Sequence, residues 1–167
     1  EVMMRGTFAN IRIRNEMAPG TEGGFTKLYP EEKILPVYDA VVEYKKRGTD
    51  LVVIGGKEYG TGSSRDWAAK GTKLLGVKTV IAESFERIHR SNLIGMGILP
   101  LQFINGVNRK NLNLIGSELI SVIDIENGIN PSDQVVLELK YSSGDIKKVN
   151  TLCRIDTKNE LEYYKNG

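Results

Sequence analysis

The fold of this chain is decided by residues 51–75, which read LVVIGGKEYGTGSSRDWAAKGTKLL. The segment opens with Leu51-Val52-Val53-Ile54, a continuous apolar run typical of a strand packed on both faces of a parallel sheet. It then passes through glycines and serines into apolar side chains that recur at helical spacing from about Ser63. The segment therefore predicts a strand, a polar loop and an amphipathic helix, in that order.

The segments on either side continue this alternation. Upstream, residues 36–47 predict a helix that ends at Gly48, where a left-handed cap is favoured. Downstream, the patterns predict a strand over 79–82, a helix from about Phe85 to Met96 and a short strand over 99–103. Strands that alternate with helices in this way are typical of parallel strands joined by right-handed crossovers.

After Asn105 the pattern changes to that of antiparallel strands. Residues 119–125 and 135–141 are predicted to be extended, and a turn at 142–145 leads into a return strand that ends near Ile155. These strands predict an additional antiparallel β layer beside a mainly parallel central sheet, so the fold class is α/β. One face of the return strand carries four residues that we expect to be buried: Val149, Thr151, Cys153 and Ile155.

Two further segments have clear local signals. Residues 17–30 are rich in glycine and proline, which predicts a surface loop. Residues 157–160 have the spacing of a capping box and predict a last helix that extends through Tyr164.

Composition limits the classes of function. A chain of 167 residues with 40% hydrophobic content fits a single domain over residues 1–167. With 26% charged residues and a net charge of +2, it offers no long basic surface of the kind that dominates nucleic-acid affinity. Its longest apolar runs are too short for a membrane helix, so we expect no membrane partner and a cytoplasmic location. A protein of an organelle matrix would show the same sequence features.

The cysteine count limits the metal chemistry. The single cysteine, Cys153, cannot form an internal disulfide and cannot by itself hold a metal cluster or a structural zinc. We therefore expect no metal ligands in this chain. The chain also begins at Glu1 without a recognisable start, which suggests a piece of a longer multidomain polypeptide.

The chemistry concentrates between Gly60 and Asp66. Gly60 and Gly62 allow a sharp turn and a close approach by a ligand. The spacing of Ser63 and Asp66 predicts a helix start, whose free N–H groups and positive dipole end favour an anion. Arg65 adds a planar fork that suits a carboxylate. At the carboxyl end of a parallel sheet, where such folds bind ligands, these residues indicate a carboxylate receptor.

Other interpretations of this loop are weaker or simpler. The pattern from Gly60 to Arg65 resembles a dinucleotide fingerprint in which arginine replaces the third glycine. It lacks the lysine of a phosphate-binding P-loop, which excludes that motif. The simplest alternative is structural: the serines only cap a helix, and Arg65 only presents its charge to solvent.

Three blocks of the sequence together resemble the C-terminal domain of aconitases and of the related iron-regulatory proteins. They read RGTFANIR at 5–12, GGKEYGTGSSRDWAAKG at 55–71 and AESFERIHRSNL at 82–93. The likeness covers essentially all 167 residues, and the continuation DWAAKG favours this branch over the isopropylmalate isomerase small subunit.

The resemblance implies a three-layer β/β/α swivelling domain of a hydro-lyase. That enzyme, aconitate hydratase, isomerises citrate to isocitrate through cis-aconitate in the tricarboxylic acid cycle, and these three acids are the expected partners. The implied cofactor is a 4Fe-4S cluster held by cysteines outside this chain, in cluster-bearing domains of the same polypeptide. The isolated chain is therefore predicted to be inactive.

The resemblance also implies roles for individual residues. Ser63 would be the base that removes a proton from the substrate, while Ser64 and Arg65 would bind substrate carboxylate. Arg12 would be a second carboxylate-binding arginine, although Arg14 would point the same way on a strand and remains an alternative.

Two alternative functions stay open at this stage. One is an RNA-binding half of an iron-regulatory protein, since RNA is a possible partner of the full-length protein. The other is the small subunit of a two-chain hydro-lyase such as isopropylmalate isomerase.

His89 and three arginines require separate interpretations. His89 is the only histidine, but it shares a helix face with Phe85 and Leu93, which favours a partly buried structural role. Three arginines within or after the block at 82–93 are predicted to form a solvated basic face rather than an RNA site: Arg87, Arg90 and Arg109.

Overall fold

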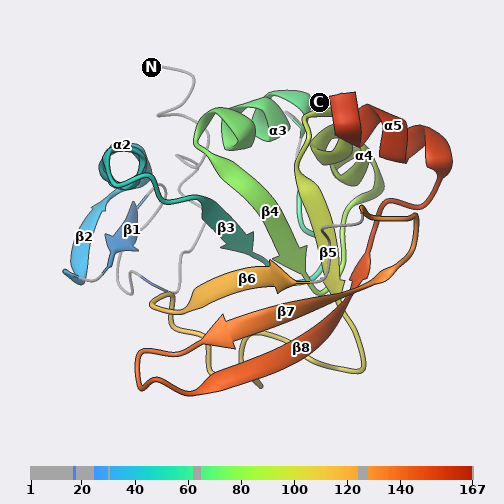
Figure 1. Cartoon of the computed structure of the whole chain (residues 1–167). Helices are drawn as coiled ribbons and strands as arrows, with labels where there is room; N and C mark the ends of the chain where they lie inside the picture. Colours follow the sequence, from blue (N-terminus) through green and yellow to red (C-terminus); the bar gives the residue numbers. More distant parts are fainter. Residues whose placement is uncertain (1–16, 18–24, 30, 62–64, 124–127, 167) are drawn as a thin grey trace.

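A six-stranded mixed sheet runs through the molecule in the order β3-β4-β5-β8-β7-β6 (Figure 1). The computed structural model describes residues 17, 25–29, 31–61, 65–123 and 128–166, and for 65–68 the backbone alone. The strands of the main sheet are β3 (Leu51–Ile54), β4 (Val77–Ala82), β5 (Leu99–Phe103), β6 (Leu119–Ile123), β7 (Gln134–Lys140) and β8 (Ile146–Cys153).

The sheet has a parallel half and an antiparallel half that are joined directly. β3, β4 and β5 pair in parallel, whereas β8, β7 and β6 pair antiparallel. The two halves meet where β5 pairs antiparallel with β8, with Leu101 opposite Cys153. The predicted α/β class is confirmed, and the antiparallel layer is hydrogen-bonded to the parallel sheet rather than separate from it.

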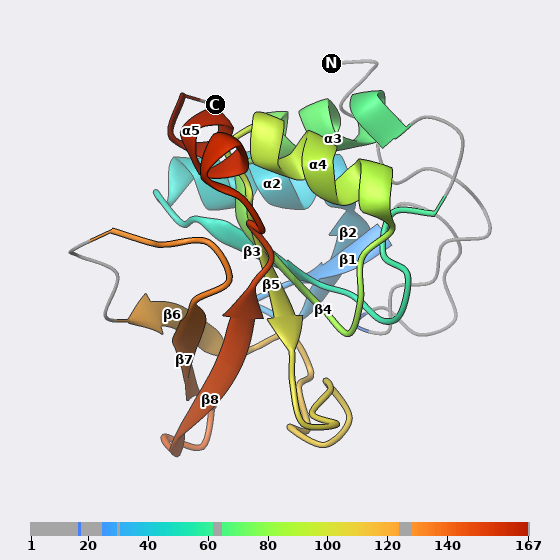
Figure 2. The same cartoon turned by 90° about the vertical axis from the view of Figure 1, so that its right-hand side faces the viewer.

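Strand β4 divides two hydrophobic cores. Val80, which is fully buried, packs with Leu93 in a cluster on the helical side of the sheet. Its neighbour Ile81 points the other way, into a cluster with Leu101 and Leu137. Helices α3 (Arg65–Leu74), α4 (Arg87–Gly95) and α5 (Lys158–Asn166) lie along one side of β3–β5, and strands β6–β8 lie across the other (Figures 1 and 2). This is the predicted three-layer β/β/α arrangement.

Strand β3 contacts both cores but is only half-buried. Val52 and Ile54 pack on one cluster, whereas Leu51 and Val53 pack on the other. All four are partly exposed because β3 is the last strand at one edge of the sheet. The apolar run therefore predicted the two-sided packing correctly, and the edge position reduces the burial.

A small hairpin occupies part of the segment predicted as a surface loop. Strand β1 (Phe25–Leu28) pairs antiparallel with β2 (Lys33–Pro36), which leads straight into helix α2 (Val37–Lys46). The loop prediction for 17–30 is thus wrong over β1. The glycines and prolines that precede β1 favour a loop, and they outweigh the weak signal of a four-residue strand. Its pairing partner, β2, follows shortly after it in the sequence.

The predicted start of α4 needs a small correction, whereas the predicted start of α5 is confirmed. Helix α4 begins at Arg87 rather than Phe85, because Phe85 forms a bridge with Tyr59 and Glu86 is the N-cap. At α5 the capping signal is confirmed: the Thr157 hydroxyl accepts a hydrogen bond of 3.1 Å from the Glu160 N–H. The Glu160 carboxylate in turn accepts one of 3.0 Å from the Asp156 N–H.

Arg90 contradicts the predicted basic face. It is only 9% exposed, and its guanidinium donates to the Arg154 carbonyl at 2.6 Å and to the Glu160 carboxylate at 3.1 Å. Asp156 lies 3.6 Å from the same guanidinium. Arg87 on the same helix is exposed, so these two arginines do not share a solvated surface. Sequence spacing could not show this, because the carboxylates come from a segment about 70 residues later.

We expect Arg90→Ala to lower the free energy of unfolding by about 2 kcal/mol. Removing one partner of a buried ion pair costs about 3–5 kcal/mol, and the partial exposure of the carboxylates reduces that figure. Urea unfolding of the chain, followed by circular dichroism, measures it. Arg87→Ala is the matched control, and equal effects of the two substitutions would show that the pair contributes nothing.

The helices of the described part of the chain are all too short or too polar to cross a membrane.

Candidate active site

The loop at residues 55–61 lies where strands β3 and β4 end, and α3 begins four residues after it in the sequence. Two backbone hydrogen bonds extend the pairing of these strands into the loop: the Gly55 N–H donates to Ile81 at 2.8 Å, and the Glu83 N–H donates to Gly56 at 3.1 Å. The predicted position of the polar loop at the carboxyl ends of the parallel strands is thereby confirmed.

The middle of the loop is held by the segment that follows β4. The Tyr59 N–H donates to the Ser84 carbonyl at 3.0 Å, and the Glu86 N–H donates to the Tyr59 carbonyl at 2.9 Å. The Ser84 hydroxyl also accepts a hydrogen bond of 2.7 Å from the Glu58 N–H. Two blocks that are separate in sequence, 55–61 and 83–86, therefore form one framework.

Gly60 turns the loop against helix α4. Its φ of +94° lies in the left-handed region, which glycine adopts without strain. A Cβ atom built at this position would overlap the Cβ, Cγ and Cδ2 atoms of His89. His89 is 3% exposed, and its ring lies 5.4 Å from that of Tyr59. The predicted burial of His89 is confirmed, and it is deeper than expected.

Tyr59 supports the loop without titrating near neutral pH. Its ring meets Phe85 edge-on at 6.2 Å, and burial raises the pKa of its hydroxyl to about 12. The phenol therefore stays protonated, which argues against Tyr59 as a proton acceptor.

The residues predicted to touch substrate lie largely outside the described part of the chain. Ser63, Ser64, Arg12 and its alternative Arg14 are in undescribed segments. Arg65 is the first residue of α3, and its side chain is likewise not described. The structure thus places the backbone on both sides of the two serines, and their roles remain predictions.

Comparison with known proteins identifies the family. The sequence model of the aconitase C-terminal domain matches residues 1–106, which include the whole loop and helix start described above. The chain belongs to this family.

Relatives of this aconitase C-terminal domain match it along its entire length. An aconitate hydratase A of Legionella pneumophila is 66% identical over 167 residues, all of this chain and 19% of that protein. An aconitate hydratase A of Escherichia coli is 60% identical over 166 residues, 99% of this chain and 18% of that protein. The chain therefore spans about a fifth of the length of these relatives.

A solved 3-isopropylmalate dehydratase of Methanocaldococcus jannaschii gives a TM-score of 0.41 at 21% identity, over 79% of this chain and 80% of that one. At that level the likeness adds nothing to the assignment.

An iron-sulfur cluster does not fit the donor atoms of this aconitase C-terminal domain. Such clusters are held by several cysteine thiolates, and this chain has one cysteine. Cys153 is fully buried on β8, and burial raises the pKa of its thiol, which keeps it protonated. Within the described residues, no three His, Cys, Asp or Glu side chains gather as a metal site requires.

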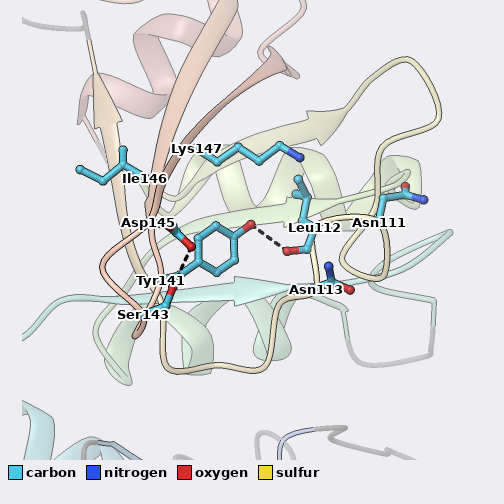
Figure 3. A pocket seen from close by; sticks show the side chains of 8 residues that line it. All are labelled: Asn111, Leu112, Asn113, Tyr141, Ser143, Asp145, Ile146 and Lys147. Carbon is cyan, nitrogen blue, oxygen red and sulfur yellow. Dashed lines mark hydrogen bonds between the residues drawn. The ribbon is translucent and has the colours of Figure 1, made fainter.

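An open hollow of about 540 Å³ lies elsewhere on the domain, beside the β7–β8 turn. None of its lining residues belongs to the loop at 55–61. They are residues 111–113, Tyr141, Ser143 and residues 145–147. The Tyr141 hydroxyl donates to the Leu112 carbonyl at 2.7 Å, and Ser143 bonds Asp145 at 3.1 Å (Figure 3). Because these polar groups satisfy one another, we assign the hollow no binding role.

Sequence reasoning missed the residues that hold the loop. Glu58, Ser84 and Phe85 lie within the blocks that carry the family resemblance, but no spacing rule pairs a loop with a segment more than 20 residues away. The available signal was indirect: the two blocks carry the resemblance together, which is expected of segments that form one site.

Proposed function

We propose that this domain supplies the catalytic base and carboxylate-binding groups of an aconitate hydratase that interconverts citrate and isocitrate through cis-aconitate. Its family membership supports this, as do relatives called aconitate hydratase A that match the whole chain. The main structural support is the loop at 55–61, which lies at the carboxyl edge of the sheet and precedes α3 in the sequence.

In the proposed reaction Ser63 accepts the proton that leaves the substrate carbon. A serine hydroxyl is a poor base in water, so its deprotonated form needs stabilisation in a site closed to solvent. The start of α3 offers free N–H groups and the positive end of a helix dipole for this purpose. The electrons of the broken C–H bond form the double bond of cis-aconitate as the C–O bond breaks, and the departing hydroxyl takes up a proton and leaves as water. The acid that assists this departure would come from a partner domain.

Ser64 and Arg65 are proposed to bind one substrate carboxylate, since a guanidinium matches the two carboxylate oxygens. Arg12 is proposed as a second carboxylate ligand, with Arg14 as the alternative. These contacts orient the acid so that the proton to be removed faces Ser63.

We propose that residues 1–167 are one domain of a longer polypeptide. Any 4Fe-4S cluster of that enzyme would be held by cysteines outside this chain, because the cysteine present here is single and buried. The domain would then complete a site built mainly by its partner domains.

Comparing the full-length polypeptide with the isolated domain tests this function. We expect the full-length protein to convert both citrate and isocitrate into cis-aconitate, which is followed by its ultraviolet absorbance. The isolated domain should show no turnover, because it lacks the cluster ligands. Turnover by the domain alone would contradict the proposal. Activity restored by a separately made larger subunit would instead favour a two-chain hydro-lyase.

A further inference from the structure

Glu58 has an unusual backbone conformation in the loop that precedes the proposed base. Its φ of +51° lies in the left-handed region, which costs a residue with a side chain about 1 kcal/mol or more. Such a conformation persists only when its surroundings favour it over the ordinary ones. The contacts of Glu58 therefore determine the backbone path of the residues that follow it in the loop.

Hydrogen bonds hold Glu58 on both sides of its backbone. Its N–H donates to the Ser84 hydroxyl at 2.7 Å. Its carbonyl accepts from the Thr61 hydroxyl at 2.5 Å and from the Thr61 N–H at 3.3 Å. The second pair closes a turn from Glu58 to Thr61, and the first fixes that turn to the segment after β4.

Ser84 is attached to the loop by three groups. Besides its hydroxyl, its carbonyl accepts from the Tyr59 N–H at 3.0 Å, and its N–H donates to Gly56 at 3.5 Å. Its backbone contacts would survive a change of side chain, whereas the bond to Glu58 depends on the hydroxyl alone. Removal of the Ser84 hydroxyl would therefore break one contact of the loop, the hydrogen bond from the Glu58 N–H.

We propose that Ser84 is a positioning residue for the hydration reaction: its hydroxyl holds Glu58 in the left-handed conformation and so fixes the loop up to Thr61, from which the chain continues to Ser63. This inference rests on the proposed function, in which Ser63 is the base. Thr61 is tied to the Glu58 carbonyl and precedes Ser63 by two residues, so a changed backbone angle at Glu58 would move the point from which the chain continues to Ser63.

The effect should fall on turnover rather than on substrate binding. A displacement of about 1 Å can lower a rate about 100-fold, because proton transfer requires hydrogen-bond distance between the reacting atoms. Attraction between a guanidinium and a carboxylate falls off more gradually with distance. Loss of positioning therefore lowers kcat more than it raises KM.

The test compares Ser84→Ala with Ser84→Thr in the full-length polypeptide, with citrate as substrate. We expect Ser84→Ala to lower kcat about 10- to 100-fold with KM changed less than about 3-fold. Ser84→Thr keeps the hydroxyl and should restore most of kcat. Ser91→Ala is the matched control, since the Ser91 hydroxyl bonds the Arg87 carbonyl within α4 at 3.3 Å.

The outcomes separate this inference from the proposed function. If Ser63→Ala abolishes turnover while Ser84→Ala behaves like Ser91→Ala, the positioning role of Ser84 is wrong and the function stands. If Ser63→Ala leaves turnover intact, both are overturned. Should Ser84→Ala fail to fold, Ser84→Thr and Ser84→Val provide the same comparison, because their side chains have the same shape and differ only in the hydroxyl. Equal kcat values for that pair would overturn the inference.

Discussion

Ser63→Ala in the full-length enzyme is expected to lower kcat about 1,000-fold while KM for citrate stays within a few-fold. General base catalysis contributes about 100- to 10,000-fold, and alanine cannot accept a proton. Steady-state kinetics in both directions measure the loss, and the visible absorbance of the protein checks that its cofactor content is unchanged. Both directions should suffer equally, since the same group would remove and return the proton.

Arg65→Lys is the contrasting variant for that experiment. An ammonium keeps the charge but cannot make the two-pronged contact with a carboxylate, so KM should rise more than kcat falls. If Ser63→Ala shows the same pattern as Arg65→Lys, with weakened binding and nearly normal kcat, the base is another group.

Gly60→Ala is expected to lower turnover at least about 100-fold and to destabilise the domain by about 3 kcal/mol. Two costs add at this position. Alanine is strained at a φ of +94°, and its Cβ would overlap atoms of His89 that lie close to the α4 backbone and cannot swing aside. The loop must therefore move away from α4, and the chain toward Ser63 moves with it. Kinetics of the full-length enzyme and thermal unfolding measure the two effects.

Gly48→Ala separates these costs. Gly48 also has a left-handed φ, +69°, but a Cβ atom there would meet nothing within 4 Å. It should cost about 1 kcal/mol of stability, with turnover unchanged. Similar kinetics for the two variants would mean that contact between the loop and His89 has no part in the function.

The sequence predicted most of the fold because its strongest signals were local. The apolar run at Leu51, the helix ending at Gly48 and the alternation through Cys153 each depend on neighbours a few residues apart. The β1 strand was missed because its signal is four residues long and is preceded by glycines. Arg90 was misplaced because a charged side chain on a helix usually faces water, and only its distant carboxylates bring it inside.

The position of the loop at 55–61 was predicted correctly, but the contacts that hold it were not. The glycines, serines and Arg65 predicted a loop at the carboxyl edge of the sheet that leads into a helix start. What fixes that loop is a serine 26 residues beyond Glu58 and a histidine that fills the space beside Gly60. Such contacts depend on how the helices that connect β3, β4 and β5 pack on the sheet. Local residue patterns do not encode that packing.

The edge position of β3 has a mechanical consequence. β3 is the terminal strand of the sheet. Within the described residues, the hydrogen bonds that tie its loop to other segments run toward β4 and the segment before α4. A body that approached the opposite flank could dock and withdraw without rupturing a single ladder bond of the six-stranded sheet.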